Sequence, residues 1–143
     1  MSGADKSHAE LEGFGLRSVE KITGTSIFAA QGWNEQRFTR FIFETERIKR
    51  RIEASIYEHF YGNTPHGVSI EVSEAYGCPV KCAHCASGSL PESYRALTAE
   101  EIAGEAQFLI DYNRTSNGRS DLPTFVCYQG IGEPTLVSAQ ILD

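Results

Sequence analysis

The sequence predicts an α/β fold centred on one βαβ unit, and three segments carry that prediction. Residues 68–72 (VSIEV) alternate apolar and polar side chains, which is typical of a strand. Residues 97–110 repeat apolar residues at helical spacing. Residues 124–129 (TFVCYQ) form a β-branched and aromatic run between Pro123 and Gly130, which predicts a buried strand. Strand, helix and strand in this order predict two parallel strands joined by a helical crossover.

The predicted helix has a start signal as well as an apolar face. Thr98 is followed three residues later by Glu101, which makes a capping box. A cap of this kind stabilises a helix by about 1 kcal/mol. One apolar stripe then follows, made of Ile102, Ala106, Leu109 and Ile110.

The rest of the chain divides by composition. Residues 1–15 are polar and glycine-containing, and we expect a flexible N-terminus there. Residues 16–65 predict a small accessory unit, α/β or β-rich, with residues 41–43 (FIF) as a strand core. Residues 52–61 fit either a helical face or a strand by periodicity alone. Residues 66–143 would hold the βαβ unit.

Length and composition describe an ordinary small globular protein. The chain has 143 residues, 41% of them hydrophobic and 22% charged, which is enough for one domain with a moderate core. No apolar run approaches the roughly 20 residues of a membrane span, and the N-terminus lacks an apolar signal core. We therefore expect a cytoplasmic protein. The net charge of −6 argues against non-specific binding to nucleic acid.

Three cysteines lie within eight residues and are the strongest chemical signal. Cys78, Cys82 and Cys85 have the spacing C-x3-C-x2-C. Zinc sites usually pair their cysteines as C-x2-C and take four ligands. Three close thiolates instead suit three corners of a cubane iron–sulfur cluster. One iron would then have no protein ligand and could hold a substrate or cofactor.

A second signal follows the predicted strand at residues 124–129. The sequence GIGEP (residues 130–134) is a glycine-rich turn with one carboxylate, Glu133. In βα barrels, functional groups gather at the carboxyl ends of the strands. This turn and the cysteine motif would both follow parallel strands, about fifty residues apart.

The cysteine motif and the GIGEP turn together resemble the radical SAM superfamily. Around them, residues 76–88 (YGCPVKCAHCASG) and 95–102 (RALTAEEI) are similar to the RNA adenine-C2/C8 methyltransferase family. The resemblance covers roughly residues 52–137. It implies the first part of a (βα) barrel, a [4Fe-4S] cluster, S-adenosylmethionine, an RNA substrate and an electron donor such as flavodoxin or ferredoxin.

The resemblance also implies roles for individual residues. Cys78, Cys82 and Cys85 would bind the cluster, and Gly132 and Glu133 would contact S-adenosylmethionine. Glu58 matches a carboxylate that serves as proton acceptor in the family, and this match favours a strand for residues 52–61.

Two positions depart from the family pattern. Glu71, seven residues before Cys78, stands where the methyltransferases have a cysteine that resolves a covalent adduct with the substrate. A carboxylate cannot do that chemistry, because attack on sulfur needs a thiolate. His84 replaces an aromatic residue beside the adenine of S-adenosylmethionine.

Two strands cannot close a barrel, so we expect this chain to be the N-terminal part of a longer protein, with little or no activity alone. Two other functions stay open. One is a radical SAM enzyme with a different reaction, which Glu71 favours. The other is a non-catalytic zinc or metal-binding fragment in which His84 or Cys127 supplies a fourth ligand.

Overall fold

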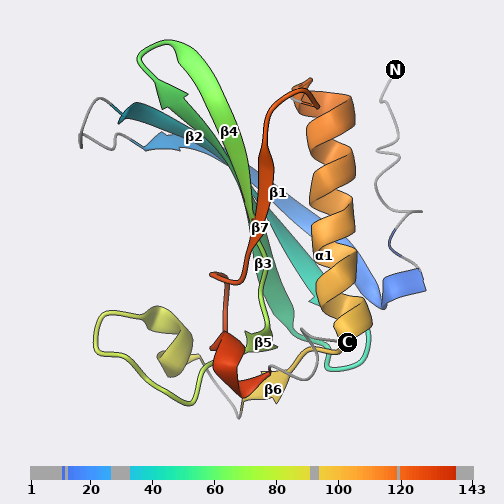
Figure 1. The fold of residues 1–143 in the computed structure, drawn as a ribbon. Coiled ribbons are helices and arrows are strands. Elements are labelled where there is room, and N and C mark those ends of the chain that lie inside the picture. The colour runs from blue at the N-terminus through green and yellow to red at the C-terminus, as the bar shows by residue number, and fades with distance from the viewer. Residues whose placement is uncertain (1–10, 12, 27–32, 91–93, 119, 138–143) are drawn as a thin grey trace.

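The computed structural model describes residue 11 and residues 13–26, 33–90, 94–118 and 120–137. The described elements are β1 (Leu16–Ser26), β2 (Trp33–Thr45), β3 (Arg51–Tyr61), β4 (Thr64–Glu71), β5 (Ala75–Tyr76), β6 (Arg95–Ala96), α1 (Ala99–Tyr112) and β7 (Thr124–Cys127). They form a sheet with one helix against it (Figure 1). The α/β prediction is therefore confirmed at the level of a mixed fold, and the incomplete barrel stays a prediction.

One five-stranded sheet organises the molecule, in the order β1-β2-β3-β4-β7. Strands β1 to β4 form an antiparallel meander, and β7 returns parallel to β4. The parallel register runs from Val68 opposite Thr124 to Glu71 opposite Cys127. Helix α1 lies between these two strands in the chain, so the predicted βαβ unit is confirmed. A two-stranded ribbon of β5 and β6 lies beyond the end of β4 (Figure 1).

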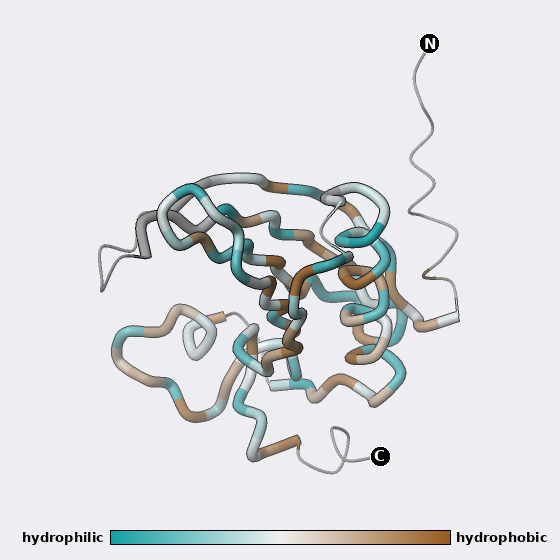
Figure 2. Tube along the Cα trace, turned by 45° about the horizontal axis from the view of Figure 1, so that its top comes forward, coloured by the Kyte–Doolittle hydropathy of each residue, from teal (hydrophilic) through white to brown (hydrophobic). Residues whose placement is uncertain are grey.

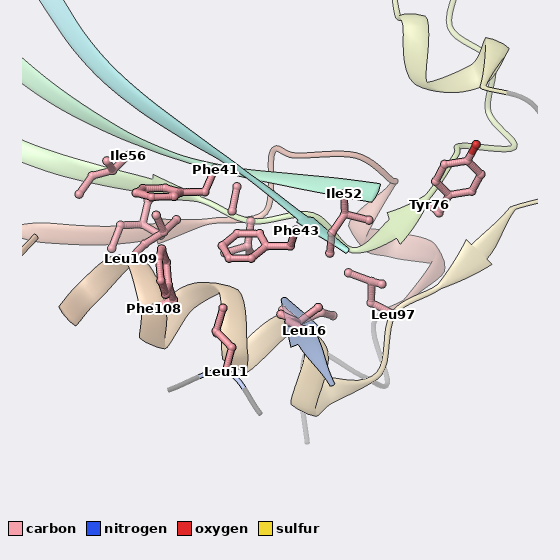
Figure 3. Packing of buried hydrophobic residues seen from close by; sticks show 14 of the residues in the cluster. Leu11, Leu16, Phe41, Phe43, Ile52, Ile56, Tyr76, Leu97, Phe108 and Leu109 are labelled. Atoms are coloured by element: carbon pink, nitrogen blue, oxygen red, sulfur yellow. The ribbon is translucent and has the colours of Figure 1, made fainter. Parts of the chain in front are cut away.

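Helix α1 covers one face of the sheet through an aromatic cluster. The rings of Phe41 and Phe43 on β2 meet Phe108 on α1 edge-on, with centroids 4.9 and 5.3 Å apart. Such edge-to-face pairs stabilise by about 0.5–1.5 kcal/mol beyond their buried area. Figure 3 shows this contact, with Leu109 beside the rings and Leu11 and Leu16 at the edge of the cluster.

The helix start follows the sequence prediction. Oγ1 of Thr98 accepts a hydrogen bond from the backbone N–H of Glu101, and the Glu101 carboxylate accepts one from the backbone N–H of Thr98. The same carboxylate oxygen pairs with Arg47 at 2.7 Å. This contact ties the helix start to the turn after β2.

Residues 52–61 are a strand, as the family resemblance favoured. Ile52, Ala54 and Ile56 are each 1% exposed and belong to the hydrophobic core, because every second side chain of a strand lies on the same face. Hydrophobic and hydrophilic residues accordingly alternate along the strands in Figure 2.

The prediction of a buried strand at residues 124–129 was wrong in two respects. Strand β7 ends at Cys127, and it lies at the edge of the described sheet. Phe125 is 60% exposed and Val126 41% exposed, because no described strand or helix covers them. A β-branched and aromatic run predicts a strand correctly but carries no information about how many neighbours cover it.

The predicted apolar stripe of α1 is only half right. Ile102 and Leu109 are buried, but Ala106 and Ile110 are only partly so. The residues that share the buried face include Phe108 and two carboxylates, Glu101 and Glu105. Both carboxylates accept backbone hydrogen bonds on this face: Glu101 from the Thr98 N–H and Glu105 from the Ser73 N–H.

The predicted division into units remains a prediction. The boundary after residue 65 falls inside β4, and β4 pairs with β3 along most of its length. Within the range predicted as a flexible N-terminus, residues 1–10 and 12 lie outside the described residues, while Leu11 is buried in the core. No helix in the described part of the chain is long and apolar enough to cross a membrane.

Candidate functional site at the carboxyl ends of β4 and β7

The cysteine motif and the GIGEP turn lie at the same end of the sheet. The cysteine loop (residues 77–90) follows β4, and the glycine turn (residues 130–133) follows β7. The ladder between the strands continues past their ends, since the Val72 N–H donates to the Cys127 carbonyl and the Gly130 N–H donates to the Val72 carbonyl. Parallel pairing therefore brings together two motifs that are fifty residues apart in sequence.

Backbone hydrogen bonds hold the glycine turn against the segment that leads into the cysteine loop. The N–H groups of Glu74 and Ala75 both donate to the Ile131 carbonyl, at 2.9 and 3.0 Å. The Leu97 N–H donates to the Glu74 carbonyl at 2.9 Å, which attaches the strand before α1 to the same segment. The two motifs thus share one short stretch of backbone, residues 72–75.

The cysteine loop is a compact series of turns. Gly77 and Lys81 have positive φ angles of 72° and 54°. The Cys85 N–H donates to the Cys82 carbonyl at 3.0 Å. A Cβ at Gly88 would lie 2.6 Å from the Cα of Lys81, so only glycine allows this close approach. A 3-10 turn at Ala86–Ser89 follows.

The cysteines have the donor chemistry of a metal site. All four cysteines of the chain lie in its described part, and none forms a disulfide. Cys82 and Cys85 are exposed and Cys78 is partly exposed. Hydrogen bonds from the side chain and backbone of Ser87 lower the pKa of the Cys85 thiol, which favours the thiolate that metals bind.

The three thiols are not gathered around one point. Across the described ranges, no three side chains of cysteine, histidine, aspartate or glutamate lie close enough to hold a metal ion. One partly exposed and two exposed thiols lie on one turn-rich loop, beside the glycine turn, and their number and chemistry fit an iron–sulfur cluster. They do not form a preassembled cage.

The glycine turn ends in a capped 3-10 turn at Pro134–Leu136. Gly132 has a φ angle of 135°, which favours glycine. Oε1 of Glu133 accepts hydrogen bonds from the backbone N–H and the hydroxyl of Thr135, at 3.3 and 2.8 Å. These contacts orient the Glu133 carboxylate at the end of β7, on the partly exposed turn.

A buried carboxyl group lies beneath the glycine turn, and the sequence analysis missed it. Glu74 is 1% exposed, and neither of its carboxyl oxygens has a hydrogen-bond partner among the described residues. Burial raises the pKa of Glu74 to about 7, and the charge of Glu133 acts in the same direction. Glu74 follows the alternating segment that predicted β4, and no local pattern distinguishes it from a surface glutamate.

A second buried carboxyl group, Glu105, reaches the same segment from α1. Its Oε2 accepts a hydrogen bond from the backbone N–H of Ser73 at 3.0 Å, and the residue is fully buried. Burial raises the pKa of Glu105 well above the ordinary range of a carboxyl group. The sequence analysis missed this residue too, because i, i+4 spacing from Glu101 is typical of a solvated helix face.

Glu71 lies in a polar row on the sheet face opposite α1. The strand registers align Arg40, Ser55, Glu71 and Cys127 across β2, β3, β4 and β7. Burial raises the pKa of Glu71, and the charge of Arg40 partly offsets that effect. Cys127 is thus the thiol in register with Glu71.

Glu58 is not placed with the other predicted site residues. It pairs with Val68, three residues before β4 ends, which is about 10 Å along the strand. Alternation puts Glu58 on the same face of β3 as Ile56, the face that packs toward α1, whereas Glu71 lies on the other face. His84 is exposed within the cysteine loop.

Curated proteins similar to this chain are described as probable dual-specificity RNA methyltransferases RlmN. One, from Chlorobium phaeovibrioides, is 31% identical over 100 residues, which is 69% of this chain and 26% of that protein. One from Prochlorococcus marinus (strain NATL1A) is 32% identical over 107 residues, 73% of this chain and 28% of that protein. One from Exiguobacterium sibiricum is 34% identical over 83 residues, 58% of this chain and 21% of that protein.

Each match covers only a part of the relative's own length. The chain spans about a quarter of the length of the curated proteins it matches. No protein-family profile matches the chain.

Proposed function

The chain is related in sequence to the RlmN radical SAM RNA methyltransferases, and we propose on that basis that it binds a [4Fe-4S] cluster and S-adenosylmethionine. One observation carries the proposal. The cysteine loop and the glycine turn follow two paired parallel strands, and hydrogen bonds from Glu74 and Ala75 to Ile131 hold them side by side. A cofactor held by one loop would therefore be within reach of a ligand held by the other.

Cys78, Cys82 and Cys85 are the proposed cluster ligands. Three cysteine thiolates leave one iron of a cubane cluster without a protein ligand. When bound, the cluster would supply the electron that cleaves S-adenosylmethionine reductively. The exposure of the loop allows its thiols to rearrange around a cluster, and the lowered pKa of Cys85 assists deprotonation on binding.

Gly132 and Glu133 are the proposed contacts to S-adenosylmethionine. The Glu133 carboxylate would accept a charge-assisted hydrogen bond from the cationic amino group of the ligand. Gly132 has no side chain, so a ligand could approach the backbone closely there. The bonds from Thr135 to Glu133 already hold the carboxylate in one orientation.

The proposed substrate is RNA, with an adenine as the methylated base and flavodoxin or ferredoxin as electron donor. The RNA substrate is supported by the relatives, which are described as RNA methyltransferases and of which this chain covers about a quarter. The adenine and the electron donor are what the resemblance of the sequence to the methyltransferase family implies. The proton-acceptor role of Glu58 also stays a prediction, and its position on the face toward α1 does not support it. A Glu58→Gln variant that keeps full activity in an otherwise active protein would remove that assignment.

Glu71 favours a second candidate function, a radical SAM reaction other than methyl transfer. Resolution of a protein–substrate adduct through a disulfide needs a thiolate at that position. The chain has a half-buried carboxyl group there instead. A non-catalytic zinc or metal-binding role is the third possibility.

Anaerobic reconstitution with iron and sulfide tests the proposal. We expect about four iron and four sulfide per chain, and a change in the paramagnetic resonance of the reduced cluster when S-adenosylmethionine is added. Cys78→Ala, Cys82→Ala and Cys85→Ala should each lose the cluster. Cys127→Ala is the matched control and should keep it. Stoichiometric zinc without sulfide would overturn the proposal in favour of the zinc-binding fragment.

A further inference from the structure

The hydroxyl and the backbone N–H of Ser73 are both hydrogen-bonded at the junction of the two loops. The residue is fully buried. Its hydroxyl donates to the Glu53 carbonyl on β3 at 2.6 Å and accepts from the Ile131 N–H of the glycine turn at 3.0 Å. One side chain thus joins the central sheet to the turn that carries Gly132 and Glu133.

The backbone of Ser73 is also bonded to helix α1. Its N–H donates to Oε2 of Glu105, a buried residue of α1. The next two N–H groups, of Glu74 and Ala75, donate to the carbonyl of Ile131, the residue whose N–H the Ser73 hydroxyl accepts. Ile131 is therefore bonded through both its N–H and its carbonyl to residues 73–75.

The hydrogen bonds between Ile131 and residues 73–75 fix the position of the glycine turn. The turn follows an exposed edge strand of four residues. Without the hydroxyl, the Glu53 carbonyl would lose a donor and the Ile131 N–H an acceptor in a partly buried place, which disfavours the observed geometry. The bonds of Ile131 to Glu74 and Ala75 and of Gly130 to Val72 would remain, so the turn would loosen rather than detach.

We propose that Ser73 is a positioning residue that fixes the glycine turn relative to the cysteine loop and so determines the affinity for S-adenosylmethionine. The inference rests on the proposed function for the identity of the ligand. Its structural half, that the Ser73 hydroxyl orders Ile131, stands independently of any ligand. Ser73 itself makes no contact with the ligand in this proposal.

The test compares three variants of the whole 143-residue chain. Ser73→Ala removes the hydroxyl, and Ser73→Thr retains it. Thr45→Ala is the matched control, since the Thr45 hydroxyl is equally buried and likewise both donates to and accepts from backbone, in this case of Arg50 in the turn between β2 and β3. Iron content, circular dichroism and the dissociation constant for S-adenosylmethionine are measured for each.

We expect Ser73→Ala to keep the cluster and to weaken S-adenosylmethionine binding about tenfold, because the variant loses two partly buried hydrogen bonds, to Glu53 and from Ile131. Ser73→Thr should stay within about threefold of the parent, and Thr45→Ala should leave the affinity unchanged. Unchanged affinity in a folded Ser73→Ala variant, or an equal loss in Thr45→Ala, would overturn the proposal.

Amide hydrogen exchange separates this inference from the proposed function. The Ile131 amide should exchange faster in Ser73→Ala than in the parent, and Thr45→Ala should not change it. If the parent chain binds neither cluster nor S-adenosylmethionine, the proposed function fails, and exchange still decides whether Ser73 orders the turn. Equal protection of Ile131 in Ser73→Ala and the parent would refute the positioning role.

Discussion

Oε2 of Glu74 lies close to Gly132, too near the place where any other residue would have its Cβ atom. A Cβ added at Gly132 would be 2.8 Å from that oxygen and 3.2 Å from the Ala75 nitrogen. Steric contact with the Glu74 carboxyl group therefore favours glycine at position 132. The φ angle of 135° also favours glycine, because other residues rarely adopt it. The structure predicts how these two effects can be separated.

Gly132→Ala should destabilise the chain more than Gly118→Ala does. Gly118 also has a positive φ angle, 62°, but a Cβ there would meet nothing within 4 Å. Gly118→Ala thus measures the cost of an ordinary left-handed backbone without a steric contact, about 1–3 kcal/mol. The φ angle of 135° at Gly132 adds a backbone cost that this control does not contain. Chemical denaturation measures the unfolding free energy of Gly118→Ala, of Gly132→Ala, of Glu74→Ala and of the Gly132→Ala/Glu74→Ala double variant. The last three values give the coupling free energy between Gly132 and Glu74. If the losses of unfolding free energy simply add in the double variant, the Glu74 carboxyl group does not cause the instability of Gly132→Ala.

Stability should fall as pH rises from about 4.5 to 7, and Glu74 should account for part of that fall. The pKa of Glu74 is about 7 in the folded chain and ordinarily near 4.5, so the folded state holds a proton that the unfolded chain releases in this window. The stabilising effect is fully present below pH 4.5 and is lost as the pH passes 7.

Glu74→Gln keeps the shape of the side chain and removes its titration. The variant should gain in melting temperature relative to the parent as pH rises, by about 4 °C between pH 5 and pH 8, after allowance for partial solvation of the site. The buried Glu105 titrates in the same direction, and the charge of Glu74 is one of the effects that raise its pKa, so the difference between the two proteins reports Glu74 together with its coupling to Glu105. A constant difference at all pH values would rule out the raised pKa.

Phe43→Ala should cost about 3–5 kcal/mol of unfolding free energy, because it opens a cavity beneath α1. Phe43 is fully buried and its ring packs edge-on against Phe108. Phe125→Ala is the matched control, the same change at a ring that is 60% exposed on β7, and should cost less than about 0.5 kcal/mol. Urea denaturation measures both. Similar losses would mean that β7 is covered in solution.

Glu71 should prevent release of a methylated adenine from this chain, because the resolving step needs a thiolate at that position. The measurement is transfer of labelled methyl from S-adenosylmethionine to unmodified ribosomal RNA, followed by nucleoside mass spectrometry. Free methyladenosine would contradict the assignment of Glu71, or would indicate that Cys127, its register neighbour on β7, supplies the thiol. Loss of that product in Cys127→Ser would identify the second case.

Local sequence patterns determined the elements that depend on near neighbours in the chain. The capping box of Thr98 and Glu101 placed the start of α1 correctly, since its bonds join residues only three apart. Period-two alternation found β4, and the order of elements predicted that β7 pairs parallel to it. The spacing of three cysteines indicated a metal site because ligands on one short loop need no distant partner.

Only the tertiary structure decided which groups are covered and which meet. Phe125 resembles a core residue in sequence, yet it is exposed because β7 is an edge strand. Glu74 and Glu105 resemble surface residues, yet both are buried where β4, α1 and the glycine turn converge. Burial depends on what packs over a residue from elsewhere in the chain, and a hydroxyl such as that of Ser73 gains its partners only when segments 20 and 58 residues away fold against it.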